Sequence, residues 1–342
     1  KDSVSFTVTL SDTIRPVLIT KNITVYLDAN TGTVSISPVD VDNGSFDNCA
    51  LSLDSVIPNT FYCDNLGNNT VTLYASDGHG NFSSATAIVN VQYATPPFIT
   101  ASIADDTTCN GQQIDIHLLS NITATSFTWT VNAHPDLSGY ADGSSSNDYH
   151  INQIITNSGD TVRLIVYNIV PTIYNRCVLP VIRDSIYVNP TPRIIVSADD
   201  TLCNSSSTTF NITKPNNVRG VWRYDIDVTY PSGVTGTLGD QTNQTVLSQT
   251  DNLTNTTNNV QAVTYRFIPH INPGDGGVEC GPGVDTLITI YVNPTPRIIV
   301  SADDTLCNSS STTFNITKPN NVRGVWRYDI DVTYPSGVSG TL

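Results

Sequence analysis

Cysteine is the residue type whose chemistry is easiest to specify in this chain. Seven cysteines are present, and none belongs to a C-x-x-C pair of the kind that binds zinc. Such cysteines are typical of disulfide bonds, which persist in oxidising surroundings outside the cytoplasm. We predict three bonds, which join Cys49 to Cys63, Cys109 to Cys177 and Cys203 to Cys280. Cys307 is left over, and we expect its partner to lie beyond Leu342.

A second group of residues suits metal binding. Side chains that carry oxygen gather on one predicted loop, namely those of Asp40, Asp42, Asn43 and Asp47. Carboxylate and amide oxygens are the ligands that Ca²⁺ prefers. No glutamate follows at EF-hand spacing, so the motif is partial, and solvated turn aspartates are the alternative explanation. We expect no cofactor other than Ca²⁺.

Residues that could perform catalysis are not arranged in a recognisable motif. The five histidines share no metal-binding spacing. No glycine-rich phosphate loop follows a predicted strand, and no serine or cysteine lies in a nucleophile motif. We therefore predict that this segment is not an enzyme.

The composition predicts strands rather than helices. Glu279 is the only glutamate, and the chain has four lysines and no methionine, so good helix formers are scarce. Thr, Val, Ile, Asn and Ser are common instead, which favours strands and turns. The net charge of −15 argues against nucleic acid and anionic membranes as partners and leaves divalent cations and neutral glycans. No stretch is apolar for long enough to insert into a membrane.

The chain contains a nearly perfect internal repeat. Residues 186–238 recur as residues 290–342, and 52 of the 53 positions are identical. The single difference is Thr235 against Ser339. The offset of 104 residues is about the length of one β-sandwich domain. Arrays of such domains are typical of spacers, stalks and adhesive fibres.

Runs in which apolar residues alternate with Thr and Ser indicate strands with one buried and one exposed face. They predict an all-β chain of tandem antiparallel β-sandwiches. Residues 1–12 are predicted to be the last strand of a preceding domain, 13–92 a complete domain, 93–189 and 190–293 two larger domains, and 294–342 a truncated copy of 190–293. Prolines at each junction favour extended backbone, so we expect the sandwiches to lie end to end as a rod.

Three tryptophans recur at one place in each repeat: Trp129, Trp222 and Trp326. An exposed tryptophan could stack on a sugar ring. A recurring tryptophan near a cysteine is more typical of a sandwich core, and we predict the core position.

Two module families are recognisable at this point. Residues 93–293 resemble PKD-like repeats, through VNPTP at 188–192, DTLCN at 200–204, a strand with Trp222, and Cys280 before TLITIYVNP at 286–294. Residues 13–92 resemble a HYR-type Ig-like domain, through DNGSFDNC at 42–49, NTVTL at 69–73 and SDGHGN at 76–81. The mixture is similar to giant Bacteroidota surface adhesins of the SprB gliding-motility type, which are type IX secretion substrates.

That resemblance implies an extracellular location at the cell surface, together with adhesion and gliding motility. The implied partners are neighbouring repeats of the same chain, other chains by lateral self-association, and surface glycans or a substratum. It also implies O-glycosylation wherever Asp precedes Ser or Thr and a hydrophobic residue or Thr follows. The candidate sites are Ser3, Thr13, Ser55, Thr107, Thr161, Ser185, Thr201, Thr286 and Thr305. The alternative is that Asp ends a turn and Ser or Thr begins a strand.

Two functions fit these observations. In the first, the chain is a segment of a repetitive extracellular adhesin or filament that provides reach and a scaffold. In the second, it forms the non-catalytic stalk or the glycan-binding modules of a large secreted hydrolase. The near-identical repeat favours the first, because enzyme stalks usually have few and diverged modules.

Overall fold

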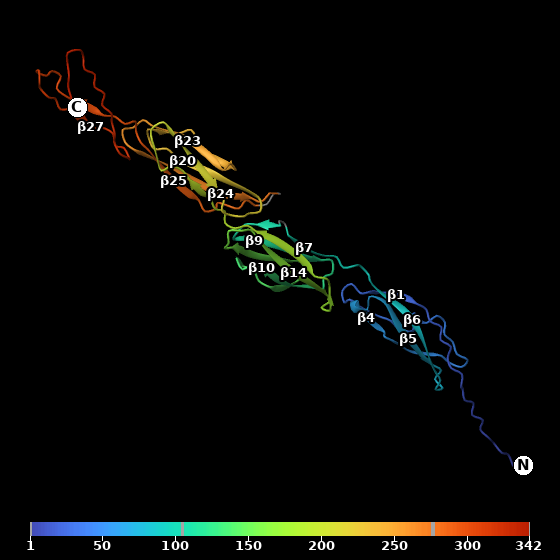
Figure 1. The fold of residues 1–342 in the computed structure, drawn as a ribbon. Helices are drawn as coiled ribbons and strands as arrows, with labels where there is room; N and C mark the ends of the chain where they lie inside the picture. The colour runs from blue at the N-terminus through green and yellow to red at the C-terminus, as the bar shows by residue number, and fades with distance from the viewer. Residues whose placement is uncertain (1, 104–105, 275–277, 342) are drawn as a thin grey trace. The chain divides into compact units, whose positions relative to one another are not determined.

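The computed structural model describes residues 2–103, 106–274 and 278–341, and almost all of its regular secondary structure is β-strand. The predicted all-β class of tandem sandwiches is therefore confirmed (Figure 1). By its contacts the chain divides into two compact units. The first comprises residues 1–106, 111–156 and 163–188, and the second comprises residues 107–110, 157–162 and 189–342. No helix in the described residues has the length and hydropathy needed to cross a membrane.

The first sandwich lies in the first unit. Its larger sheet has the strand order β1 (Ile23–Leu27), β6 (Phe82–Tyr93), β5 (Gly67–Ser76) and β3 (Ser52–Ile57). A smaller sheet pairs β2 (Thr33–Ser35) with β4 (Thr60–Tyr62), and the short helices α1 (Pro38–Val41) and η1 (Cys63–Asn65) lie in the connections. Alternate residues of β5 and β6, such as Val71, Leu73 and Val89, are fully buried. Successive side chains of a strand point to opposite faces, so the predicted alternation produces the core.

The second sandwich also lies mainly in the first unit. One sheet has the order β12 (Gly143–Ser146), β10 (Thr125–Ala133), β14 (Arg163–Ile173) and β16 (Ile182–Val188), and β15 (Cys177–Val178) pairs with β14. The other has the order β11 (Leu137–Ser138), β13 (Tyr149–Asn157), β9 (Gln112–Ser120) and β7 (Ile99–Ile103). Phe127, Tyr167 and Ile116 fill the space between the two sheets.

The third sandwich lies in the second unit. One sheet has the order β17 (Ile195–Ser197), β19 (Ser206–Thr213), β23 (Ser248–Asn255) and β21 (Val234–Thr235). The other has the order β18 (Thr201–Leu202), β25 (Thr286–Val292), β24 (Gln261–Asn272), β20 (Val221–Thr229) and β22 (Gln241–Gln244). The second unit also contains β8 (Thr107–Thr108). Phe210, Tyr224 and Phe267 meet in an aromatic core.

In the first and third sandwiches, an early strand runs parallel to the last strand. β1 pairs in parallel with β6, and β18 pairs in parallel with β25. These two pairs are parallel exceptions within the predicted antiparallel sandwiches, because each early strand connects to the opposite sheet and no hairpin forces it to reverse. Since the early strand and the last strand point the same way, the chain enters each of these sandwiches at one end and leaves it at the other. We name these ends the upstream end and the downstream end.

The segments outside the three sandwiches have little regular structure. Residues 2–12, predicted to be a last strand, form none, and Val4, Phe6, Val8 and Leu10 are exposed. A strand needs a neighbouring strand for its backbone hydrogen bonds, and no strand of the described residues pairs with this segment. Residues 294–341 form only the two short strands β26 (Ile299–Ser301) and β27 (Asn315–Thr317).

Candidate functional site

The two cysteines of the third sandwich lie at opposite ends of it. Cys203 follows Leu202, which pairs with Val292 at the end of β25, so Cys203 lies at the downstream end. Cys280 pairs with Ile271 near the end of β24, and it precedes the start of β25. Cys280 therefore lies at the upstream end. A seven-residue strand such as β25 spans about 20 Å, whereas disulfide-bonded Cα atoms must approach to within about 7 Å.

The first sandwich has the same arrangement. Cys63 lies just before β5, whose first residue pairs with Val91 near the end of β6, so Cys63 lies at the downstream end. Cys49 lies just before β3, whose first residue pairs with the last residue of β5, at the upstream end. The ten residues of β5 separate the two cysteines by about 30 Å.

The structure consequently contains disulfides other than the predicted ones. Cys63 is bonded to Cys177 across a Cα–Cα distance of 6.1 Å, and Cys109 is bonded to Cys280 across 5.2 Å. The three pairs predicted within modules, Cys49–Cys63, Cys109–Cys177 and Cys203–Cys280, are therefore wrong. Cys49, Cys203 and Cys307 are free and exposed. Each bond joins a cysteine near the downstream end of one module, Cys63 or Cys109, to a cysteine of the next module in the sequence, Cys177 or Cys280. We call Cys177 and Cys280 the late cysteines, because each is the second cysteine of its module.

Ionic and aromatic contacts surround the Cys63–Cys177 bond in the first unit. Arg176 Nη2 lies 2.7 Å from Asp64 Oδ2, and the Arg176 guanidinium covers the Tyr62 ring at 4.0 Å. The hydrogen bond from Arg176 lowers the pKa of the Asp64 carboxyl below its ordinary value. The pair therefore stays ionised at neutral pH beside the disulfide.

The turn that carries Arg176 has a strained backbone. Tyr174 and Asn175 both have φ of 54°, a left-handed conformation that costs a non-glycine residue about 1–2 kcal/mol. The hydroxyl of Tyr174 donates to the carbonyl oxygen of Ala29 over 3.3 Å, and its ring covers Gly32, where a Cβ atom would overlap it. The conformation is thus held by contacts between the second module and a loop of the first.

A similar set of contacts surrounds the Cys109–Cys280 bond in the second unit. Asn110 Nδ2 donates to the hydroxyl of Thr191 over 2.7 Å, and Arg193 Nη1 lies 3.1 Å from Asp160 Oδ1. The backbone of Val162 donates to the carbonyl of Asn217 over 2.7 Å. Residues 107–110 and 157–162 are therefore tied to the third sandwich by covalent, ionic and backbone bonds.

These contacts recur around Cys203, also in the second unit. Asn204 Nδ2 donates to the hydroxyl of Thr295 over 2.7 Å, and the backbone of Val260 donates to the carbonyl of Asn321 over 3.1 Å. The repeated sequence thus forms the same junction twice in this unit. Only the first of the two junctions contains a disulfide in the described residues.

Buried asparagines shape the loops at both junctions. Asn157 Nδ2 donates to the carbonyl of Thr161 over 3.0 Å, and Asn255 Nδ2 donates to that of Asn259 over 2.8 Å. Both side chains are 2% exposed. Each side-chain amide hydrogen-bonds to a backbone carbonyl that has no partner in a regular strand. These bonds allow an irregular loop to be buried at a junction.

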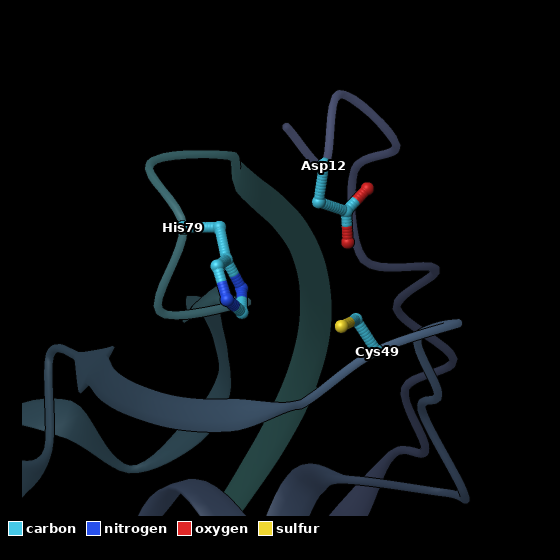
Figure 2. Close-up of side chains that lie close together, drawn as sticks. All are labelled: Asp12, Cys49 and His79. Atoms are coloured by element: carbon cyan, nitrogen blue, oxygen red, sulfur yellow. The ribbon is translucent and has the colours of Figure 1, made fainter. Parts of the chain in front are cut away.

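A group of titratable side chains lies at the upstream end of the first sandwich. Figure 2 shows Asp12, Cys49 and His79 approaching from three segments, and one ligand atom of each lies within 4.8 Å of the others. Asp12, Asp47 and Asp77 form an overlapping group by the same measure. Thiolate, imidazole and carboxylate suit a zinc-like ion, and three carboxylates suit Ca²⁺.

Hydrogen bonds account for much of this group. Asp77 is 1% exposed, and burial favours its neutral form, but the side chain of Asn81 and the backbone of His79 donate to it and lower its pKa. Asn81 also donates to the carbonyl of Asp12 over 3.2 Å. Asp47 Oδ1 is buried and accepts no hydrogen bond from the described residues. The group is therefore partly a structural network that closes the upstream end.

The four predicted calcium ligands are not gathered in one place. Asp40 accepts from the backbone and hydroxyl of Ser37 at the start of α1, and Asp42 accepts from the backbone of Ser45. The bonds from Ser37 lower the pKa of the Asp40 carboxyl, and the side chain of Ser45, and after it the backbone of Ser45, lower that of Asp42. Of the three predicted carboxylates only Asp47 joins a group of potential ligands in the described residues, and Asn43 is exposed in the turn. Calcium binding stays a prediction, which an unchanged melting temperature in chelator would exclude.

The predicted glycosylation sites differ in accessibility. Ser3, Thr13 and Thr305 are exposed, and Ser55, Thr161, Ser185, Thr201 and Thr286 are half-buried. Thr107 is 8% exposed, so a folded chain could not carry a glycan there. Thr107, Thr201 and Thr286 each begin a strand, as the alternative explanation of the motif predicts. Glycosylation stays a prediction that an intact mass equal to that of the bare sequence would exclude.

The tryptophans occupy the predicted core position. Trp129 and Trp222 are 6% and 5% exposed, and Trp129 Nε1 donates to the carbonyl of Ala141 over 3.0 Å. Trp326, in the incomplete repeat, is half-buried.

Sequence reasoning missed both the pairing of the cysteines and the group around Asp12. The signal for the pairing is the place of each cysteine relative to a strand end. Cysteines beside opposite ends of one long strand cannot meet. No comparable signal joins Asp12 to Asp77 and His79, because their approach depends on how the N-terminal segment folds back over a hairpin turn.

Comparison with known proteins agrees with one of the predicted modules. Residues 106–192 match the family described as PKD-like domain, which confirms the module type predicted for residues 93–189. No curated protein matches the chain.

Among solved structures, the chain is similar to the Escherichia coli adhesin FdeC, with 13% identity, 84% of this chain and 99% of that chain covered, and a TM-score of 0.34. The I67–I69 fragment of titin covers 83% of this chain and 99% of its own at 8% identity, with a TM-score of 0.33. Domains 3–6 of protocadherin gamma B7 cover 90% and 85% at 12% identity, with a TM-score of 0.31. Values this low assign neither a family nor a function to the chain.

Proposed function

We propose that this chain is a segment of a repetitive extracellular surface adhesin or filament, and that its modules provide reach and a scaffold for adhesion. The observation that carries the proposal is the parallel pairing of an early strand with the last strand in the first and third sandwiches. A chain that enters at one end and leaves at the other adds the length of a module with each repeat. Hairpin-like modules, which return the chain to its starting end, would not.

The disulfides support both the location and the mechanical role. Two cystines persist only where the surroundings are oxidising, which supports a location outside the cytoplasm. Each bond connects consecutive modules in the sequence. A pulling force along the chain would therefore be carried by the disulfide as well as by the linker between those modules. This arrangement suits a load-carrying surface fibre.

The sequence resemblance supports the finer part of the proposal. The PKD-like module and the predicted HYR-like domain resemble those of gliding-motility adhesins exported by type IX secretion, so we place adhesion and gliding among the proposed roles. The proposed partners are neighbouring repeats, laterally associated chains, and surface glycans or a substratum. The stalk of a secreted hydrolase is the second candidate, and the near-identical repeat favours the adhesin over it.

Contour length tests the proposal. A second copy of residues 190–293, inserted after Asn293, should lengthen the purified chain by about 30 Å in electron micrographs, the span of a strand of eight to ten residues. A second insertion should add the same length again. Compact particles whose length does not change with copy number would contradict the proposal. Antibody labelling of native cells then separates the two candidates, since an adhesin predicts label along long thin fibres.

A further inference from the structure

Each of the three sandwich modules carries one cysteine near its upstream end and one near its downstream end. The late cysteines Cys177 and Cys280 each pair in the backbone ladder with the end of a long strand, at Ile173 and Ile271. Both are bonded to a downstream cysteine of the module before. The rule that emerges is one disulfide per junction, formed between consecutive modules.

Cys203 occupies the place in the third sandwich that Cys109 occupies in the second module. Each is followed by an asparagine whose amide donates to a threonine hydroxyl of the next module over 2.7 Å. In each case the oxygen of that asparagine accepts from the backbone of a buried asparagine, over 2.6 Å at Asn157 and 2.7 Å at Asn255. The surroundings of the free thiol of Cys203 thus reproduce those of a bonded cysteine.

At the Cys109 junction, the segment that carries Cys280 lies against the start of the third module. The backbone of Val284 donates to the carbonyl of Pro192 over 2.8 Å, and Asn189 Nδ2 lies 4.0 Å from Cys280 Sγ. Asn189 is fully buried by this packing. The segment 280–284 therefore packs between Cys109 and the first residues of the third module.

The equivalent place beside Cys203 is a cavity of about 320 Å³. Cys203 itself lines it, together with Asn293, Pro296 and Trp326, the repeat equivalents of Asn189, Pro192 and Trp222. Its walls are thus built from the same residues that receive the Cys280 segment one junction earlier. A free thiol therefore lies on the wall of a cavity whose residues match those around a bonded cysteine.

We infer that Cys203 is a cross-linking site for the next repeat, and that it forms a disulfide with that repeat's equivalent of Cys280. The partner is a further copy of the segment 278–284 belonging to the same chain, and the cavity receives it. The inference concerns how modules are joined, and it holds for an adhesin and for an enzyme stalk alike.

The chemistry is an oxidation that requires an external disulfide compound. The Cys203 thiolate attacks one sulfur of that compound, and the compound's sulfur–sulfur bond breaks. One half of the compound leaves as a thiol, and the other half stays bonded to Cys203 as a mixed disulfide. The second cysteine then displaces the other thiol and completes the bond between repeats. Two cysteine thiols lose two electrons and two protons in total, and one disulfide molecule becomes two thiols.

The test completes the last repeat. Residues 239–293 are appended after Leu342, and the extended chain is folded with glutathione disulfide, alkylated and analysed by mass spectrometry without reduction. The peptides around Cys203 and Cys307 have the same sequence, so the two sites must be distinguished by the variants Cys203→Ser and Cys307→Ser. We expect alkylation of Cys49 and Cys307 alone in the extended chain.

The two variants give opposite outcomes for the competing pairings. We expect Cys203→Ser to leave the appended cysteine alkylated, and Cys307→Ser to leave it bonded. Loss of the bond in Cys307→Ser instead would show pairing within a module and would overturn the inference. An appended cysteine that is alkylated in the unsubstituted extended chain would also overturn it, as would disulfide-linked dimers in place of a bond within one chain. The 342-residue chain, in which Cys203 should be fully alkylated, is the control.

Discussion

At the scale of single residues, a buried carboxylate organises the third sandwich. Asp251 is fully buried and accepts from the hydroxyls of Tyr230 and Tyr265 over 2.6 Å each, and from the backbone of Thr237 over 2.6 Å. A buried acceptor with several donors is stable only while every donor is satisfied. The site is structural, because the two tyrosine hydroxyls and the carboxylate hydrogen-bond to one another.

Removal of this carboxylate should destabilise the third sandwich selectively. Asp251→Ala leaves five donors without this acceptor, namely the two tyrosine hydroxyls, the backbone and hydroxyl of Thr237 and the backbone of Leu238, at about 1–3 kcal/mol for each one that stays buried and unsatisfied. Hydrogen exchange of the β19–β25 amides should therefore accelerate strongly, while exchange in the first sandwich stays unchanged. The control is Asp227→Ala, since Asp227 is exposed and lies 3.8 Å from Arg266 at the surface. Equal acceleration in both variants would contradict the assignment.

The same network predicts a loss of stability at alkaline pH. Burial, and after it the hydrogen bond to Asp251, raises the pKa of Tyr230 to about 12, and the pKa of Tyr265 is raised for the same reasons. A tyrosine of the unfolded chain titrates near pH 10. Above that pH the unfolded state binds fewer protons than the folded state, so stability falls as the pH rises from about 10 to 12.

Urea unfolding followed by tryptophan fluorescence measures this loss. The midpoint should be constant below about pH 9 and should decrease above pH 10. In Tyr230→Phe the decrease should be smaller, because one of the tyrosines with a raised pKa is gone. A decrease of the same size in that variant would exclude Tyr230 as a cause.

At the scale of elements, the turn between β14 and β15 determines how the second module meets the first. Its strained residue, Tyr174, places an aromatic ring over Gly32 of the loop before β2. Gly32 itself has a φ of 66°, so this position needs glycine both for its backbone and for the space above it.

Gly32→Ala should therefore destabilise the fold more than alanine does at a glycine that also has a positive φ but has no neighbouring atoms where the added Cβ would lie. Gly44 is the matched control, since its φ is 88° and nothing lies within 4 Å of an added Cβ. Each substitution incurs the left-handed penalty of about 1 kcal/mol, and only Gly32→Ala also displaces the Tyr174 ring. Differential scanning calorimetry should show a lower melting temperature for Gly32→Ala than for Gly44→Ala. Equal values would mean that the ring contact contributes nothing.

At the scale of the whole molecule, equivalent residues of the two nearly identical repeats differ in the exposed fraction of their side chains. Phe210 is fully buried, whereas its copy Phe314 is 47% exposed, and Tyr224 and Tyr328 differ in the same way, at 0% and 47%. The segment 294–341 resembles residues 190–237 in sequence, but it lacks the strands equivalent to β23, β24 and β25 within the described chain. Half a sandwich cannot exclude water from its inner face.

A pair of identical substitutions measures this difference. Phe210→Ala should cost about 3–5 kcal/mol, the usual price of emptying a core position, and Phe314→Ala much less. The measurement is protection of the β19 amides and of residues 312–317 against hydrogen exchange. When residues 239–293 are appended, Phe314→Ala should become as costly as Phe210→Ala. An equal cost in the 342-residue chain would contradict this account of the last repeat.

Much of the architecture could be predicted because it depends on local patterns. Alternation of apolar and polar residues, as along β5 and β24, fixes which face of a strand is buried and hence the all-β class. Trp129 and Trp222 were placed in the core correctly for the same reason, whereas Trp326 is half-buried. Repetition of 53 residues showed that the modules are arranged in tandem.

The pairing of cysteines and the grouping of Asp12 with Asp77 were decided by the tertiary structure alone. Cys203 and Cys280 follow one another in sequence as a predicted pair would, but they lie at opposite ends of one sandwich because β18, which precedes Cys203, runs parallel to the last strand β25. A sequence pattern reports what a residue prefers around it, and it does not report which distant strand end becomes its neighbour. The sequence by itself therefore determined the all-β tandem architecture, whereas only the packed sandwiches decided which cysteines meet.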